Sequence, residues 1–205
     1  MCEGPNIKTY CERHLQPSEQ IYRIFYYDAP PLEKVVINPL GTTIDFSVTA
    51  KTINARLDGI RETPYMALRL GKVNWFNDWT IKEQALKEII SGAKKISDLT
   101  DKDFRPNIRQ KIVDMKIGLD IATIAYKKLA DRIVLIAGDS DFVPAAKLAR
   151  MEGVEVTIDP LGKRLSSDLI EHVDYVETKL DPDNLSDVSE TMKKFFVTNK
   201  KEISR

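Results

Sequence analysis

The residues of this sequence that most suggest chemistry are two aspartates, Asp139 and Asp141, which flank Ser140 directly after an apolar stretch. That stretch, residues 133–137, is typical of a strand buried on both faces of a parallel sheet, and ligands of such sheets bind at the carboxyl ends of the strands. Two carboxylates about 4 Å apart repel by roughly 4 kcal/mol at an effective dielectric of ~20, unless water, a proton or a cation intervenes. Carboxylate oxygens on a turn suit Mg²⁺ or Mn²⁺, but they also suit a helix N-cap, and both interpretations stay open.

A second candidate acid is Asp114, which stands three residues after Lys111 at the start of an apolar-periodic stretch. The period predicts a helix that runs from Asp114 to about Ala130. Asp120 lies six residues further along, so a helix rotates it by about 240° and the two acids cannot share one face. We therefore favour Asp114 as a ligand and keep Asp120 as a weaker candidate. Their ordinary roles would be a helix cap and an exposed helical residue.

Alternating strands and helices must position these acids. After the strand at 133–137 we expect a helix over 142–151 that ends at Gly153, a strand over 154–158, a helix over 166–172 and a short strand at 175–176. Strand, helix and strand at this spacing predict a parallel sheet with right-handed crossovers. Upstream we expect helices over 7–15, 49–62 and 80–90, and strands over 21–27 and 65–73. Asp28 follows the first of these strands and is a weak candidate for the same edge.

Residues 91–110 show little periodicity and carry mixed charge, which predicts a long loop of the kind that is usually functional or mobile. Basic side chains gather there, and Lys102, Arg105 and Arg109 are candidates for RNA contacts. The acids Asp98, Asp101 and Asp103 alternate with them, so a solvated loop is the more ordinary interpretation.

The two acidic segments together resemble a known family. The order of segments resembles the NYN domain, and more narrowly its LabA-like branch within the PIN-like nuclease superfamily. The segments that carry this resemblance are Lys-x-x-Asp at a helix start, an apolar strand, Gly-Asp-Ser-Asp-Phe, a helix closed by glycine and a further apolar strand. Tyr26-Tyr27-Asp28, residues 68–72 and residues 166–175 look like further landmarks. The resemblance covers roughly residues 5–178, and residues 110–156 are its most diagnostic part.

The resemblance implies a three-layer α/β/α sandwich with a mainly parallel central sheet, in one domain over residues 1–180 with a helix and mobile loop inserted at 81–110. It also implies a ribonuclease that hydrolyses RNA with Mg²⁺ or Mn²⁺ held by a carboxylate cluster. Carried over residue by residue, Asp114, Asp139 and Asp141 match the catalytic and metal-binding acids. Ser140 would orient the turn, and Lys111 would contact a phosphate.

The sequence departs from the family at two places. NYN domains normally begin with a strand that ends in Asp-Gly-x-Asn, whose aspartate is a central ligand, and Glu3-Gly4-Pro5-Asn6 matches this only superficially. We therefore expect the opening strand and helix to be missing, by truncation or by true absence. Ile112 stands where the family commonly has glycine. These departures favour an alternative function, a catalytically inactive RNA-binding or interaction module with the same fold.

Composition limits the remaining choices. With 31 basic and 31 acidic side chains the chain is not a globally basic nucleic-acid binder, and no apolar run approaches the ~20 residues of a membrane span. Cys2 and Cys11 form no disulfide framework, which indicates the reducing cytoplasm. Residues 181–205 are polar and predict a tail or a peripheral helix.

A haloacid-dehalogenase-like phosphatase is a third interpretation of Asp139-Ser140-Asp141, but no acidic strand of that class follows. PIN-like domains often pair, so a homodimer is a further expectation.

Overall fold

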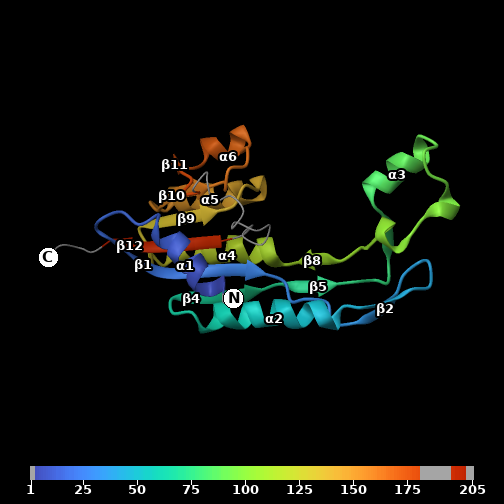
Figure 1. Cartoon of the computed structure of the whole chain (residues 1–205). Coiled ribbons are helices and arrows are strands. Elements are labelled where there is room, and N and C mark those ends of the chain that lie inside the picture. The colour runs from blue at the N-terminus through green and yellow to red at the C-terminus, as the bar shows by residue number, and fades with distance from the viewer. Residues whose placement is uncertain (1–2, 181–194, 202–205) are drawn as a thin grey trace. The chain divides into compact units, whose positions relative to one another are not determined.

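The computed structural model describes residues 3–180 and 195–201 of a mixed α/β chain (Figure 1). The chain divides into two compact units. Unit 1 comprises Met1–Asp28, Arg56–Gly71 and Ile112–Arg205, and unit 2 comprises Ala29–Ala55 and Lys72–Lys111. Each unit is described by itself below.

Unit 1 contains a six-stranded sheet in the order β11-β10-β9-β12-β1-β4. Its strands are β1 (Glu19–Asp28), β4 (Met66–Leu70), β9 (Arg132–Ile136), β10 (Glu155–Asp159), β11 (Tyr175–Val176) and β12 (Phe195–Lys201). β1 pairs with β4, β9 with β10, and β10 with β11, all in parallel, whereas β12 is antiparallel to both β1 and β9. Because β12 opposes both of its neighbours, the other strands run in one direction and their carboxyl ends share one edge.

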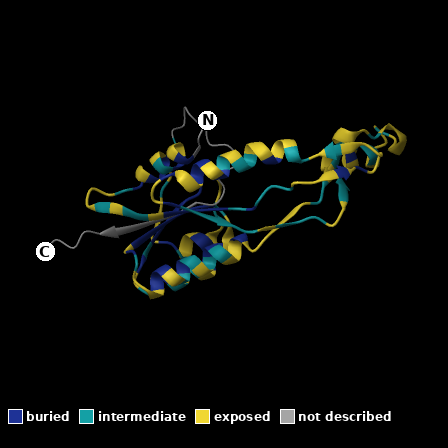
Figure 2. Cartoon of the chain, turned by 90° about the horizontal axis from the view of Figure 1, so that it is seen from below, coloured by how far each residue is buried: buried dark blue, intermediate teal, exposed yellow. Residues whose placement is uncertain are grey.

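The core of unit 1 lies on this sheet. All five residues of β9 are buried, and β1 is buried from Ile24 to Tyr27 (Figure 2). Both strands are rich in β-branched or aromatic residues, which pack well on a pleated surface, and both were predicted from that composition. In Figure 2 the strands of unit 1 run between helices that lie above and below them.

The helices of unit 1 follow apolar periods. They are α1 (Glu3–Glu12), α4 (Val113–Tyr126), α5 (Val143–Met151) and α6 (Ser167–Glu171), and α2 (Ser47–Glu62) is shared between the two units. In α4, Val113, Ile117, Ile121 and Ile124 recur at spacings of three and four and are buried. The helix expected from Asp114 to about Ala130 thus begins one residue earlier and ends at Tyr126. α4 packs against α5 and also contacts β1 and β4.

The two ends of the chain compare differently with expectation. Glu3-Gly4-Pro5-Asn6 lie in α1 and form no strand, in agreement with the superficial match to the family's opening motif, although the helix expected over 7–15 begins and ends earlier. Residues 195–201 form β12 in the middle of the sheet, not a tail or a peripheral helix, while 181–194 and 202–205 lie outside the described residues. β12 opens with Phe-Phe-Val-Thr, a run of strong strand formers whose signal is diluted by polar neighbours.

Unit 2 is built from pairs of short strands. β2 (Val35–Ile37) pairs with β3 (Thr43–Asp45), β5 (Lys72–Asn74) with β8 (Arg109–Lys111), and β6 (Trp79–Ile81) with β7 (Phe104–Pro106), all antiparallel. The unit also holds α3 (Glu83–Ile90) and the 3₁₀ turns η1 (Ile96–Asp98) and η2 (Asp101–Asp103).

The predicted loop over 91–110 is therefore wrong in part, because it contains η1, η2, β7 and β8. The predicted helix over 80–90 begins later, at Glu83, because Thr80 belongs to β6. Strands of three residues are too short to show a period, and their partners lie far away in the sequence. Within the described part of the chain, no helix is long and apolar enough to cross a membrane.

Candidate active site at the carboxyl edge of the sheet

Several acids lie at the carboxyl edge of the unit 1 sheet. Asp28 ends β1, Asp159 ends β10, and the Asp139-Ser140-Asp141 turn follows β9. Adjacent strands are about 4.8 Å apart, and β12 lies between β1 and β9, so the backbones of β1 and β9 are about 10 Å apart. Asp28 and the turn therefore occupy separate positions along this edge.

The turn after β9 is a 3₁₀ turn, η3 (Ser140–Phe142), capped by Asp139. One carboxylate oxygen of Asp139 accepts a hydrogen bond from the backbone N–H of Asp141 at 3.1 Å, and Phe142, 1% exposed, anchors the turn in the core. The residues Asp139 and Asp141 are both exposed, and neither forms an ion pair with any described residue. The capping role and an accessible acid pair thus coexist in one turn.

Asp114 lies in the first turn of α4 and is exposed. α4 is adjacent to η3 in the fold, so the helix that carries Asp114 neighbours the turn that carries Asp139 and Asp141. Among the residues that the structure describes, however, no three His, Cys, Asp or Glu side chains come close enough to hold a metal ion together. The three matched acids do not form a ready three-carboxylate cluster.

The two weaker candidates are bound to arginines within unit 1. Asp28 accepts a hydrogen bond from Arg56 at 2.9 Å. Asp120 accepts from the Tyr27 hydroxyl at 2.9 Å and from Nε of Arg69 at 3.1 Å. Burial, and then the negative charge of Asp120, raise the pKa of Tyr27, so its hydroxyl stays protonated and donates. The charges of Asp28 and Asp120 are thus already offset by protein cations.

The Asp139–Asp141 pair fits a divalent cation by its donor chemistry. Mg²⁺ keeps several waters and is commonly held by one or two carboxylates, so it does not require a preformed protein cage. Exposed carboxylate oxygens with no ion-pair partner among the described residues meet that requirement.

The basic candidates lie in unit 2. Lys102 is in η2, Arg105 in β7, and Arg109 and Lys111 are in β8, and all four residues are exposed. Nε of Arg105 donates to the hydroxyl of Thr80 at 3.1 Å. Nζ of the neighbouring Lys94 lies 2.7 Å from a carboxylate oxygen of Asp103. The hydrogen bond from Lys94, and then the one from the Thr100 backbone N–H, lower the pKa of Asp103 to about 2.

The carboxyl edge also holds a buried acid that the sequence analysis did not identify. Asp159 accepts from the Tyr10 hydroxyl at 2.5 Å and lies 3.1 Å from Nε2 of His14, and all three residues are buried. Burial alone raises the pKa of Asp159, but the hydrogen bonds from His14 and Tyr10 outweigh it and leave that pKa below its ordinary value. Asp159 lies 149 residues from Tyr10 and 145 residues from His14 in the sequence, so no local pattern could reveal these partners.

Comparisons with known proteins bear on the family of the chain. A model of the NYN domain matches residues 45–180, about two thirds of the chain. Uncharacterized protein MJ0482 of Methanocaldococcus jannaschii is 28% identical over 126 residues, which are 62% of this chain and 48% of that protein. The chain therefore spans about half the length of this relative. A crystal structure of VPA0982, a protein of unknown function from Vibrio parahaemolyticus, is similar over 58% of this chain and 74% of that one, with 22% identity and a TM-score of 0.30.

Proposed function

The chain belongs to the NYN domain family, and from this premise we propose that it is a metal-dependent ribonuclease of the LabA-like branch, with a PIN-like three-layer sandwich around a mainly parallel sheet. The observation that carries the proposal is the Asp139-Ser140-Asp141 turn at the carboxyl edge of the sheet. Its two acids are exposed and form no ion pair with the described residues, in a fold whose ligands bind at that edge.

Each site residue has a distinct task in this proposal. Asp139 and Asp141 hold Mg²⁺ or Mn²⁺, with Asp114 as a further ligand, and the bond from the Asp141 N–H to Asp139 keeps the turn in shape. Ser140 sets the spacing of the two acids. A bound divalent cation supplies water activation and offsets the charge that builds on the phosphate.

The exposed cations of unit 2 bind the RNA backbone. Lys102, Arg105, Arg109 and Lys111 contact phosphates in this proposal, because phosphate contacts by lysine and arginine supply most of the sequence-independent affinity for nucleic acid. We expect the protein to act in the cytoplasm, as its cysteine usage indicates.

One observation favours the alternative of an RNA-binding module without catalysis. No three-acid group forms among the described residues, and Asp28 and Asp120 are occupied by arginines. If the remaining acids cannot hold a cation tightly enough, the basic side chains would still bind RNA.

Cleavage of labelled single-stranded RNA with Mn²⁺, Mg²⁺ or EDTA tests the proposal, using the parent, Asp139→Asn and Asp141→Asn. Asp58→Asn is the matched control, because Asp58 is an exposed acid of α2 in unit 1, outside the turn. We expect metal-dependent cleavage by the parent and the control. Each turn variant should lose more than about 100-fold, above the 10- to 100-fold that outer-shell partners of metal sites contribute.

The outcomes separate the two functions. RNA binding without cleavage by a folded parent would favour the binding module. Cleavage by Asp139→Asn at the parent rate would show that the site is assigned to the wrong residues.

A further inference from the structure

The helix α4 carries a second apolar face, on the side opposite its buried residues. This outer face is formed by residues that recur at spacings of four, three and four, namely Met115, Leu119, Ala122 and Tyr126. At about 100° per residue, the four positions lie within about 60° of one another and about 180° from the buried face. α4 is thus apolar on two opposite sides, which is typical of a helix that is covered on both.

The large side chains of the outer face are open to solvent in the single chain. Met115 is 65% exposed, and Leu119 and Tyr126 are each 61% exposed. No charged residue within α4, all of whose residues the structure describes, comes within about 80° of the centre of this face. Single apolar side chains scattered on a surface are ordinary, whereas a contiguous apolar face indicates contact with another protein.

The spacing of the outer face reads the same in both directions. It is also the spacing of the seam between paired helices. A two-fold axis at its midpoint, halfway between Leu119 and Ala122, turns one α4 antiparallel to another. Met115 of one copy then lies beside Tyr126 of the other, a favourable contact of sulfur with an aromatic ring. Leu119 and Ala122 of both copies meet at the centre, large beside small, which allows close packing.

An interface between two identical chains must be self-complementary, and the outer face of α4 meets this condition. We propose that this face binds a second copy of the chain, in an antiparallel contact between the two α4 helices. The face carries no charge that would select a charged partner instead.

The size of the face predicts a weak dimer. α4 has 14 residues and is about 21 Å long, so one face of it buries less than the about 800 Å² per partner of a standard interface. The dimer therefore depends on protein concentration. It does not depend on the proposed cleavage, because Asp114 is about 110° from the centre of the face and the other proposed ligands lie outside α4.

Sedimentation equilibrium of the full chain in EDTA, from micromolar to near-millimolar protein, tests the contact. The parent should shift from monomer to dimer as its concentration rises. Leu119→Lys should raise the dimer Kd more than about tenfold, because the two-fold axis brings two lysines together at the centre. The matched control is Ile170→Lys, at an apolar residue of α6 that is 50% exposed, and it should leave Kd unchanged. Far-UV circular dichroism verifies that each variant is folded.

Disulfide cross-linking tests the antiparallel register. Met115→Cys and Tyr126→Cys are each combined with Cys2→Ser, and Cys11 is kept because it is buried. In the proposed pair, positions 115 and 126 of the two copies are adjacent, whereas the two copies of position 115 are about 16 Å apart along the helix axis. A disulfide requires Cα atoms within about 7 Å. Mild oxidation should therefore link the two variants when they are mixed, and leave either variant alone unlinked.

Each measurement has an outcome that would overturn the proposal. A folded parent that stays monomeric at near-millimolar concentration would show that α4 does not pair. Dimerisation that Leu119→Lys leaves unchanged would show that the interface lies elsewhere. Cross-linking of Met115→Cys alone, as readily as of the mixture, would exclude the antiparallel register. Asp139→Asn should dimerise as the parent does, so failure of the proposed active site and failure of pairing are distinguishable.

Discussion

Ile112, the residue directly before α4, has a left-handed backbone with φ 73° and ψ −6°. Of the described non-glycine residues with positive φ, Ile112 is the one with a β-branched side chain. For β-branched residues a left-handed backbone is a genuine outlier. The left-handed region costs an L-residue about 1–2 kcal/mol, and glycine avoids this cost because it has no Cβ. Glycine loses about 0.5–1 kcal/mol more than alanine in conformational entropy on folding.

These magnitudes predict the sign of a simple comparison. Ile112→Ala and Ile112→Gly remove the same half-exposed side chain, so the difference between them isolates the backbone. We expect Ile112→Gly to be more stable than Ile112→Ala by about 0.5–1 kcal/mol. At Met115, the third residue of α4 and 65% exposed, the order should reverse, with glycine less stable than alanine by up to about 1 kcal/mol.

Urea unfolding followed by far-UV circular dichroism measures the difference. With a slope of about 2 kcal/mol/M, the midpoints of the two Ile112 variants should differ by about 0.3–0.5 M at unchanged slope. The two tryptophans, Trp75 and Trp79, are both in unit 2, so their fluorescence reports separately on that unit. Equal midpoints, or a higher midpoint for Ile112→Ala, would refute the claim that the backbone before α4 is strained.

Two further predictions concern the buried polar groups of unit 1. Arg132 is 1% exposed and donates hydrogen bonds to Glu19, so Arg132→Met should lower the free energy of unfolding in urea by about 3–5 kcal/mol. The control Arg61→Met, at an exposed arginine, should lower it by less than about 1 kcal/mol. Similar losses in the two variants would contradict a buried charge pair at Arg132. The pKa of Asp159 is lowered in the folded protein, so the stability that it contributes is present above the unfolded pKa of about 3.9 and is lost as pH falls through the folded value. The parent should therefore have a higher Tm than Asp159→Asn at neutral pH, and this difference in Tm should shrink below about pH 4. A difference that grows on acidification would show that folding raises the pKa of Asp159.

Local patterns were sufficient for the part of the fold around the candidate turn. The apolar run at 133–137 predicts β9, and the spacing of Ile117, Ile121 and Ile124 predicts the buried face of α4. Burial periodicity is a property of a short segment, and so is the preference of aspartate for a cap, which Asp139 satisfies within its own turn. The resemblance to the NYN domain rests largely on the same segment, and a model of that domain matches residues 45–180. The left-handed conformation of Ile112 also gives a physical reason why glycine would suit this position.

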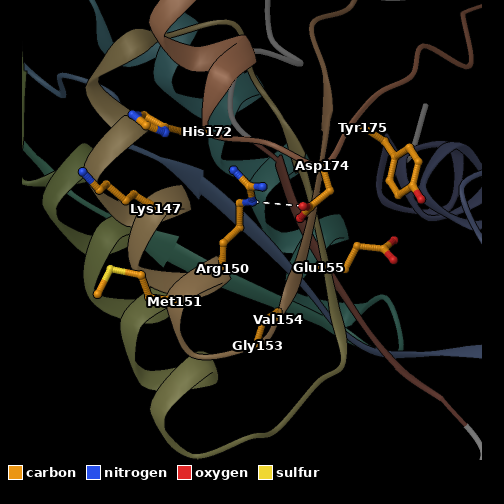
Figure 3. A pocket seen from close by; sticks show the side chains of 9 residues that line it. All are labelled: Lys147, Arg150, Met151, Gly153, Val154, Glu155, His172, Asp174 and Tyr175. Carbon is orange, nitrogen blue, oxygen red and sulfur yellow. Dashed lines mark hydrogen bonds and ion pairs between the residues drawn. The ribbon is translucent and has the colours of Figure 1, made fainter.

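Features that join distant segments could not be read in this way. Arg132 sits in an apolar strand, and its partner Glu19 is 113 residues away, so no window of sequence reveals why the charge is buried. The contacts of Asp120 with Tyr27 and Arg69, and the hydrogen bond from Arg150 to Asp174 (Figure 3), likewise join segments that are separate in the chain. The strongest case is β12, whose place between β1 and β9 depends on hydrogen bonds to both neighbours. Strand order is decided by pairing free energies summed over the whole sheet, and no single segment carries that sum.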